Sequence, residues 1–175
     1  MKKSLFLAAA AFLAAGTLSA EGLKVDGNFQ QLNDKGFVAR WHKNGAIKTT
    51  TYEVIRKEDG NILKLVSPKG YSAMYSYLHV PVKVGDSFQF KFKAKGKAAK
   101  FIFGYYAYDA KNKHAATESV HFAIDSADKF TEYKGTITVK EPPAGKSIAY
   151  VQFCFASYLA MDVEITGIEV EPVKK

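Results

Sequence analysis

The sequence predicts an all-β fold, a single β-sandwich with little or no helix after an N-terminal export signal. Apolar and aromatic side chains alternate with polar ones at a period of two along most of the chain, as in strands with one buried and one solvent-facing side. About nine or ten such segments are separated by turns rich in glycine, proline and asparagine, a spacing typical of sandwiches and barrels. No internal repeat or linker divides the chain, so residues 21–175 are expected to form one domain.

Residues 1–20 have the pattern of a cleaved signal peptide. Lys2 and Lys3 precede an apolar run over residues 5–15, and the segment ends in the small residue Ala20, which suits signal peptidase. A transmembrane helix is the alternative, but it needs roughly 18–20 apolar residues, more than this run offers. We therefore expect cleavage after Ala20, no membrane span, and a product in the periplasm or outside the cell.

Three strands are expected in the first part of the domain. Residues 23–25 form a short alternating segment before a turn. Residues 49–55 are β-branched and aromatic, which favours a strand. Residues 62–66 follow the turn Asp59-Gly60-Asn61, and this order predicts a β-hairpin with the preceding strand.

The most strongly patterned stretch lies in the middle of the chain. Residues 71–84 form a long alternating run in which Pro81 indicates a sheet edge or a bulge. In residues 88–92 phenylalanine alternates with glutamine and lysine, which predicts one buried aromatic face; a glycine-containing turn is expected to separate this strand from the next. Residues 101–109 are apolar or aromatic at both parities, so either protein covers both faces or one face is open to a ligand.

The C-terminal part of the chain is expected to complete the sandwich. The polar stretch 110–119 shows no periodicity, which predicts a surface loop, and residues 126–129 are the one place where a helical turn is expected. Strands are expected at residues 120–124, 131–140, 147–156 and 161–173, with a tight turn at Glu141-Pro142-Pro143-Ala144-Gly145.

The chain is basic, with 25 lysine and arginine residues against 17 aspartate and glutamate residues and a formal net charge of +8. A positive surface attracts nucleic acid, anionic lipid or acidic polysaccharide, although a solvated lysine face needs no ligand. For an exported protein nucleic acid is the weakest of these, and we expect no nucleic-acid partner. The single cysteine, Cys154, excludes a disulfide within the chain, and its apolar neighbours predict that it is buried.

Four segments, in order along the chain, resemble carbohydrate-binding modules with the galactose-binding-like jelly-roll fold, most nearly those of families 4, 9 and 22. Residues 82–95, V-K-V-G-D-S-F-Q-F-K-F-K-A-K, resemble the motif V-x-x-G-x-x-Y and the aromatic strand that follows it. Residues 26–30 with Trp41 downstream resemble the opening N-G-x-F-E and W, residues 130–139 resemble W-T-x-Y-x-G-x-x-x-V, and residues 165–170 resemble the closing I-D-D-V. The resemblance implies a jelly-roll sandwich that binds a polysaccharide or oligosaccharide without catalysis.

The same resemblance bears on a structural calcium, which many of these modules hold between the N-terminal turn and an acid of the closing strand. Here Gln30 stands in place of the glutamate, and Thr166-Gly167 stands in place of the aspartate pair. Calcium prefers several oxygen ligands that include carboxylates. We therefore expect neither a calcium site nor another cofactor.

An enzyme is the alternative of a different class. Glycoside hydrolysis needs two carboxylates that flank one bond, and the spacing of the acids in the middle of the chain singles out no pair. The four histidines form no metal-binding motif, and no G-x-S-x-G motif is present, so we expect no catalytic residues and no bound metal. The acids in question are Asp109, Glu118, Asp125, Asp128 and Glu132.

A sugar presents flat faces of C–H groups beside hydroxyls, so its site combines aromatic rings with hydrogen-bonding side chains. If Phe101 and Phe103 face the core, then Tyr106 and Tyr108 project outward beside a depression left by Gly104. The candidate ligand-binding residues are Trp41, Tyr75, Tyr77, His79, Gln89, Tyr106, Tyr108, Tyr150 and Gln152.

The sequence thus predicts an exported, non-catalytic carbohydrate-binding domain that recognises a polysaccharide or oligosaccharide through outward aromatic and amide side chains on one sheet face. Two alternatives remain open at this point. One is a secreted structural or protein-interaction sandwich without a sugar site, and the other is a small polysaccharide hydrolase or lyase. The oligomeric state is open as well.

Overall fold

The computed structural model describes residues 23–43 and 49–174, and all regular structure within them is β-strand, as the alternating pattern predicts. No helix in these ranges is available to span a membrane, and the expected signal peptide lies outside the described residues. In chain order the strands are β1 (Leu23–Gly27), β2 (Trp41–Lys43), β3 (Thr51–Ile55), β4 (Ile62–Ser67), β5 (Ser72–Ser76), β6 (Val80–Pro81), β7 (Ser87–Tyr108), β8 (His114–Thr138), β9 (Tyr150–Ser157) and β10 (Met161–Pro172).

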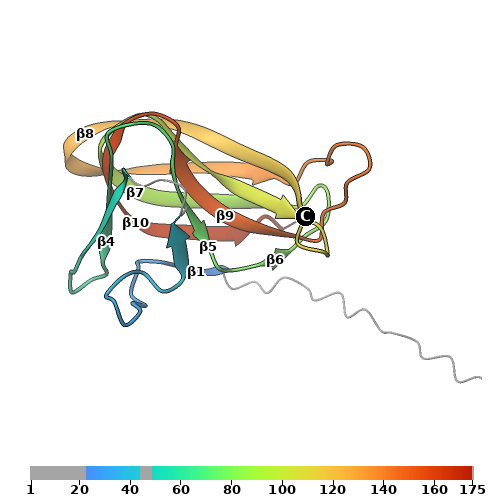
Figure 1. The fold of residues 1–175 in the computed structure, drawn as a ribbon, viewed down its shortest axis with the longest axis horizontal. Helices are drawn as coiled ribbons and strands as arrows, with labels where there is room; N and C mark the ends of the chain where they lie inside the picture. Colours follow the sequence, from blue (N-terminus) through green and yellow to red (C-terminus); the bar gives the residue numbers. More distant parts are fainter. Residues whose placement is uncertain (1–22, 44–48, 175) are drawn as a thin grey trace, which may run out of the picture.

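The strands form one antiparallel sheet that folds over on itself into two layers (Figure 1). The first layer, sheet A, holds β1, β3, β4, β10, the first half of β7 and the second half of β8. The second layer, sheet B, holds β2, β5, β6, β9, the second half of β7 and the first half of β8. This arrangement is the single β-sandwich that the sequence predicts.

β7 passes from one layer to the other as a single bent strand of 22 residues. Its pairing with β8 shifts register near Gly96 and again before Phe101. Gly96 has a φ of +113°, and a Cβ at this position would overlap the carbonyl oxygen of Asp162 on β10. Only glycine fits both constraints. The predicted turn between two separate strands is therefore wrong, because the glycine marks a bend within one strand.

β8 bends beside β7, at the left end of the view in Figure 1, where its ribbon doubles back. The loop expected at 110–119 is confirmed for residues 110–113 and wrong for residues 114–119, and the helical turn expected at 126–129 is wrong, since the chain is extended from His114 to Thr138. A short turn precedes β8, in which the Asp109 carboxylate accepts the backbone amides of Lys111 and Lys113, each at 2.8 Å. Among the described strands β8 pairs only with β7, and the polar residues that suggested a loop are typical of such an edge strand.

The turns expected elsewhere fall mostly where the sequence places them. The hairpin at Asp59-Gly60-Asn61 joins β3 and β4, which pair along their whole lengths. The alternating run at 71–84 is split into β5 and the two-residue β6. Pro81 lies in β6 at the edge of sheet B, in agreement with the expected edge position.

The core lies between the layers, and the two halves of β7 supply phenylalanines to both of its sides. Phe90 of sheet A stacks on Phe103 of sheet B with ring centroids 4.4 Å apart, and Phe92 lies 5.5 Å from Phe101. All four side chains are buried. Since side chains alternate along a strand, this inward set leaves the other parity of β7 on the outer face of sheet B.

Candidate functional site

The outer face of sheet B, the side away from the core, brings together the four residues that the alternation assigned to it. Strands β7 and β9 are neighbours, and Tyr106 is paired with Gln152 while Tyr108 is paired with Tyr150. Paired residues of antiparallel strands project from the same face. The phenylalanines that alternate with them on both strands are fully buried: Phe101, Phe103, Phe153 and Phe155.

A first row of rings crosses this face from its edge toward β7. Tyr77 lies 4.7 Å from His42 between ring centroids, and His42 stacks on Tyr75 at 5.1 Å. Tyr75 in turn meets Tyr106 edge to face at 5.1 Å. The row exists because β2 pairs with β5 and β5 pairs with β9, which places the outward residues of these strands side by side.

A second row runs beside the first. His79 stacks on Tyr150 at 4.3 Å, and Tyr150 stacks on Tyr108 at 5.3 Å. His114 of β8 lies 5.6 Å from Tyr106 and 6.0 Å from Tyr108, so it joins the two rows at one end. We call these two rows together the aromatic face.

Gln152 belongs to the same face but is largely covered. Its side chain is 9% exposed, and its Nε2 donates a hydrogen bond to the carbonyl oxygen of Ser76 at 3.1 Å. The carboxamide carbonyl oxygen has no donor among the described residues. The amide nitrogen of Gln152 therefore holds the side chain in place, and its amide oxygen can accept a hydrogen bond.

Hydrogen bonds among tyrosine hydroxyls stiffen the first row. The hydroxyl of Tyr71 lies 2.7 Å from that of Tyr75 and 3.3 Å from that of Tyr106. Burial, together with the hydrogen bonds of this cluster, raises the pKa of Tyr75 and of Tyr106 above the usual value. Both hydroxyls therefore stay protonated at neutral pH and can donate as well as accept.

Among the described residues, His42 carries a buried polar atom that lacks a hydrogen bond. Its Nδ1 is buried and has no hydrogen-bond partner among them. Burial lowers the pKa of His42 below 6.5, so the ring is neutral at physiological pH. This neutral ring lies between Tyr75, on which it stacks, and Tyr77, and so forms part of the aromatic surface.

Three members of this site were not among the expected ligand-binding residues: His42, Tyr71 and His114. His42 lies on a strand of only three residues, which is too short for the period of two to assign its face. Tyr71 and His114 carry no periodic signal either. Their positions depend on the pairing of distant strands.

Two expected ligand-binding residues lie elsewhere. Trp41 is 1% exposed and packs in the core, 5.0 Å from Phe155 between ring centroids, so its expected role as a sugar platform is wrong. Gln89 lies on the outer face of sheet A, on the opposite side of the sandwich. The expected depression at Gly104 is also absent, because a Cβ there would overlap the carbonyl oxygen of Glu118 as β8 approaches.

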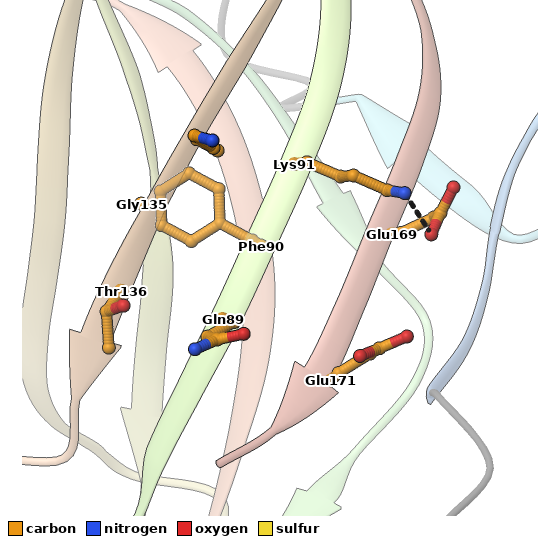
Figure 2. Close-up of a pocket in the computed structure, with 8 residues that line it drawn as sticks. Gln89, Phe90, Lys91, Gly135, Thr136, Glu169 and Glu171 are labelled. Carbon is orange, nitrogen blue, oxygen red and sulfur yellow. Dashed lines mark ion pairs between the residues drawn. The ribbon is translucent and has the colours of Figure 1, made fainter.

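The outer face of sheet A around Gln89 carries a depression of about 530 Å³ (Figure 2). Its rim is charged, and an ion pair of 2.9 Å joins Lys91 to Glu169 across the strands. The one ring that lines it, Phe90, is 3% exposed and turns toward Gly135, beneath the surface (Figure 2). The depression therefore lacks an exposed platform on which a sugar ring could stack.

Two of the five acids considered for catalysis, Asp109 and Glu118, are engaged in structural contacts. The backbone amide of Lys113, with that of Lys111, lowers the pKa of Asp109. Glu118 pairs with Lys140 at 2.7 Å. No group of three histidine, cysteine or acidic side chains with metal-binding geometry occurs within residues 23–43 and 49–174.

In the region where the resemblance places calcium, several oxygens take part in hydrogen bonds within the chain. Both carboxylate oxygens of Asp26 accept backbone amides of the following turn, at 3.0 and 3.1 Å. The Asn61 amide donates to the carbonyl oxygen of Phe29 at 2.8 Å, and the Thr166 hydroxyl donates to the carbonyl oxygen of Asn61 at 2.9 Å. These hydrogen bonds engage oxygens of the kind that calcium takes as ligands.

No protein-family model and no curated protein matches the sequence. Solved structures match its fold at low sequence identity. The family 11 carbohydrate-binding module of a cellulosomal cellulase from Clostridium thermocellum matches with a TM-score of 0.57 and 13% identity, over 90% of this chain and 98% of the module. The xylan-binding domain of family 22 from Paenibacillus barcinonensis matches with a TM-score of 0.55 and 11% identity, over 84% of this chain and 92% of the domain.

An arabinose-bound α-L-arabinofuranosidase also matches, with a TM-score of 0.59 and 13% identity, over 87% of this chain. The matched region is only 26% of the enzyme, so the chain spans about a quarter of that protein's length. The structures that match along nearly their whole length are named as binding modules. The chain therefore has the β-sandwich fold of carbohydrate-binding modules, as its motifs indicate.

Proposed function

We propose that the protein is an exported carbohydrate-binding module that holds a polysaccharide or oligosaccharide along the aromatic face of sheet B. The observation that carries this proposal is the pair of ring rows, which run side by side on one outer face and meet at His114. The C–H faces of pyranose rings pack on such rings, while Gln152 and the tyrosine hydroxyls offer hydrogen bonds to sugar hydroxyls. The sandwich fold shared with binding modules supports the same assignment.

The proposed activity is binding without catalysis. A glycosidase needs two carboxyl groups on either side of the scissile bond. The residues that strand pairing places on the aromatic face include no aspartate or glutamate. Of the acids considered for catalysis, Glu118 is held by a lysine and Asp109 by its own turn.

Replacement of Tyr108 by alanine tests the proposal. Tyr108 stacks on Tyr150 on the outer face, so its loss should weaken binding of a glycan by about tenfold, in line with the energy of one aromatic contact. Ligands are first selected on a glycan array, and affinity is then measured by titration calorimetry. Lys134→Ala, on the outer face of sheet A, is the control and should leave the affinity unchanged.

Two results would contradict the proposal. One is the absence of binding to every glycan tested at millimolar concentration. The other is a loss of about 3 kcal/mol or more in the unfolding free energy of Tyr108→Ala, because that cost is typical of a truncated core aromatic rather than a surface platform.

Export is the second part of the proposal, and the pattern of residues 1–20 supports it. Sequencing the N-terminus of the protein recovered outside the cytoplasm should give a chain that starts at Glu21. A chain that retains Met1 would contradict cleavage.

A further inference from the structure

Both rows of the aromatic face end at a small pocket. Two positively charged residues, Lys24 and Arg40, line this pocket, whereas the rows contain no lysine or arginine. Tyr77 ends the first row and His79 ends the second, and both line this pocket. Its volume is about 150 Å³, roughly that of five water molecules at about 30 Å³ each. The lining residues, which define what we call the cationic pocket, are Lys24, Val25, Arg40, Tyr77, Leu78 and His79.

Arg40 is positioned before any ligand arrives. Its carbonyl oxygen accepts the backbone amide of Tyr77 at 2.9 Å, which holds the two residues side by side. Its side-chain Nε donates to Oε1 of Gln31 at 2.6 Å, which orients the guanidinium group. The planar fork of an arginine side chain matches a carboxylate or a sulfate. The Tyr77 ring is 57% exposed, so it is available for stacking.

The two cations of this pocket are not held in ion pairs within the described residues, and Lys24 also lines a second depression together with Asp26, Glu169 and Glu171. Neither Lys24 nor Arg40 belongs to an ion pair among the described residues, whereas Lys91 and Lys95 of sheet A each pair with a glutamate. The carboxylate of Asp26, in the same N-terminal segment, accepts two backbone amides of its own turn instead. An anionic group entering the pocket would therefore meet two cations that no ion pair of the described chain engages.

The aromatic face adds no negative charge beyond the pocket. The strand pairing places no acidic side chain there to repel a second anionic sugar. At the opposite end, Lys146 lies close enough to donate to the carbonyl oxygen of His114 at 3.3 Å.

We propose that the cationic pocket binds the acidic group of an anionic polysaccharide, a carboxylate or a sulfate ester, while neighbouring sugar rings lie on the aromatic face. This inference rests on the proposed function, whose ligand class it narrows. Arg40 makes the paired hydrogen bonds to the acidic group, Lys24 adds a second charge, and Tyr77 stacks on the ring that carries the group.

Matched pairs of ligands test the inference. Oligogalacturonate and its methyl ester differ only in the charge of the carboxyl groups, and a sulfated galactan oligosaccharide and its desulfated form differ only in the sulfate. The wild-type protein should bind the charged member of one pair about tenfold more tightly, the equivalent of one charge-assisted hydrogen bond. Whichever pair shows the preference identifies the acidic group.

Variants locate the preference within the protein. Arg40→Ala should remove most of the preference for the charged ligand and leave the affinity for its neutral partner unchanged, and Lys24→Ala should reduce the preference. Lys134→Ala removes the same charge from sheet A and should have little effect. Circular dichroism confirms that each variant is folded, and should Arg40→Ala prove unstable, Lys24→Ala carries the test alone.

Two outcomes overturn the inference and leave the proposed function standing. Equal affinity for both members of each pair, with binding still weakened by Tyr108→Ala, would mean that the aromatic face binds sugars without regard to charge. An equal loss in Lys134→Ala and Arg40→Ala would mean that the attraction comes from the net charge and not from the pocket. If no glycan binds the wild-type protein at all, the proposed function fails with the inference.

Discussion

At the scale of single residues, the tyrosine hydroxyl explains why phenylalanines occupy the inner face of sheet B and most tyrosines its outer face. Phenylalanine gains most from complete burial, whereas a buried tyrosine must also find a partner for its hydroxyl. Tyr105 meets this condition in the core, where its hydroxyl donates to the carbonyl oxygen of Thr138 at 3.2 Å. Tyr106 and Tyr108 lie on the outer face, where ring neighbours and solvent share the surface.

The alternation of side chains predicts correctly which residues of β7 and β9 face the core and which face outward, because it can be read from each strand alone. The same reasoning fails for Trp41. β2 is only three residues long, so the local pattern is too short to assign a face, and only its pairing with β5 directs the indole into the core. The contact between His42 and Tyr75 depends on the same long-range pairing, which explains why the sequence did not place His42 in the site.

His42 should make stability depend on pH. Because burial lowers its pKa in the folded state, the unfolded chain binds a proton more readily below pH 6.5. The contribution of His42 to stability is thus complete above that pH and is lost as the pH falls. We expect His42→Phe, which keeps a stacked ring but cannot titrate, to lose less stability than the wild type between pH 7 and pH 5.

Urea unfolding of both proteins at pH 8, 7, 6 and 5 measures this difference. Other groups titrate in both proteins and cancel in the comparison. Parallel curves for the two proteins across this range would show that His42 is hydrated in the folded state and that its burial is overstated.

At the scale of elements, the bend of β7 is what makes two layers from one sheet. A bend at this point requires the backbone of β7 to pass close to β10, and Gly96 provides the space. The sequence shows the interruption clearly but does not distinguish a turn that reverses the chain from a bend that continues it. The distinction depends on whether β8 pairs with both halves of β7, which is a long-range property.

Gly96→Ala should destabilise the protein by about 2 kcal/mol or more, since a positive φ alone costs about 1–3 kcal/mol and the new methyl group would also push against β10. Gly145→Ala is the matched control. Gly145 has a φ of +80° and no atom within 4 Å of the added Cβ, so only the backbone cost applies. Thermal and urea unfolding measure both variants, and an equal loss would contradict the close approach at Gly96.

At the scale of the whole molecule, the all-β sandwich follows from sequence pattern, because each strand carries its own alternation and each turn its own residues. The assignment of strands to layers does not follow in the same way. Tyr75, Tyr106 and Tyr150 come from three distant segments, and the aromatic face exists only once β5, β9 and β7 are neighbours. The positions of most outward residues were therefore predictable, and their arrangement was not.

Removal of calcium should not change the stability of the whole sandwich. The oxygens near Asn61 and Thr166 already take part in hydrogen bonds within the chain. A bound ion at a hundredfold excess over its Kd would add about 2.7 kcal/mol, which a melting curve detects readily. We expect melting curves in calcium and in EDTA to coincide, and a shift of several degrees would show that a calcium site exists after all.

The most direct test of the account is a map of glycan binding by NMR, in which backbone and tyrosine ring signals are followed during titration with a glycan selected on an array. If the aromatic face binds the glycan, the largest shifts should fall on Tyr106, Tyr108, Tyr150 and Gln152, and signals from Gln89 and Thr136 on the opposite face should stay unchanged. Shifts concentrated around Gln89 and Thr136, with Tyr106 and Tyr108 unaffected, would contradict the assignment of the aromatic face as the binding site.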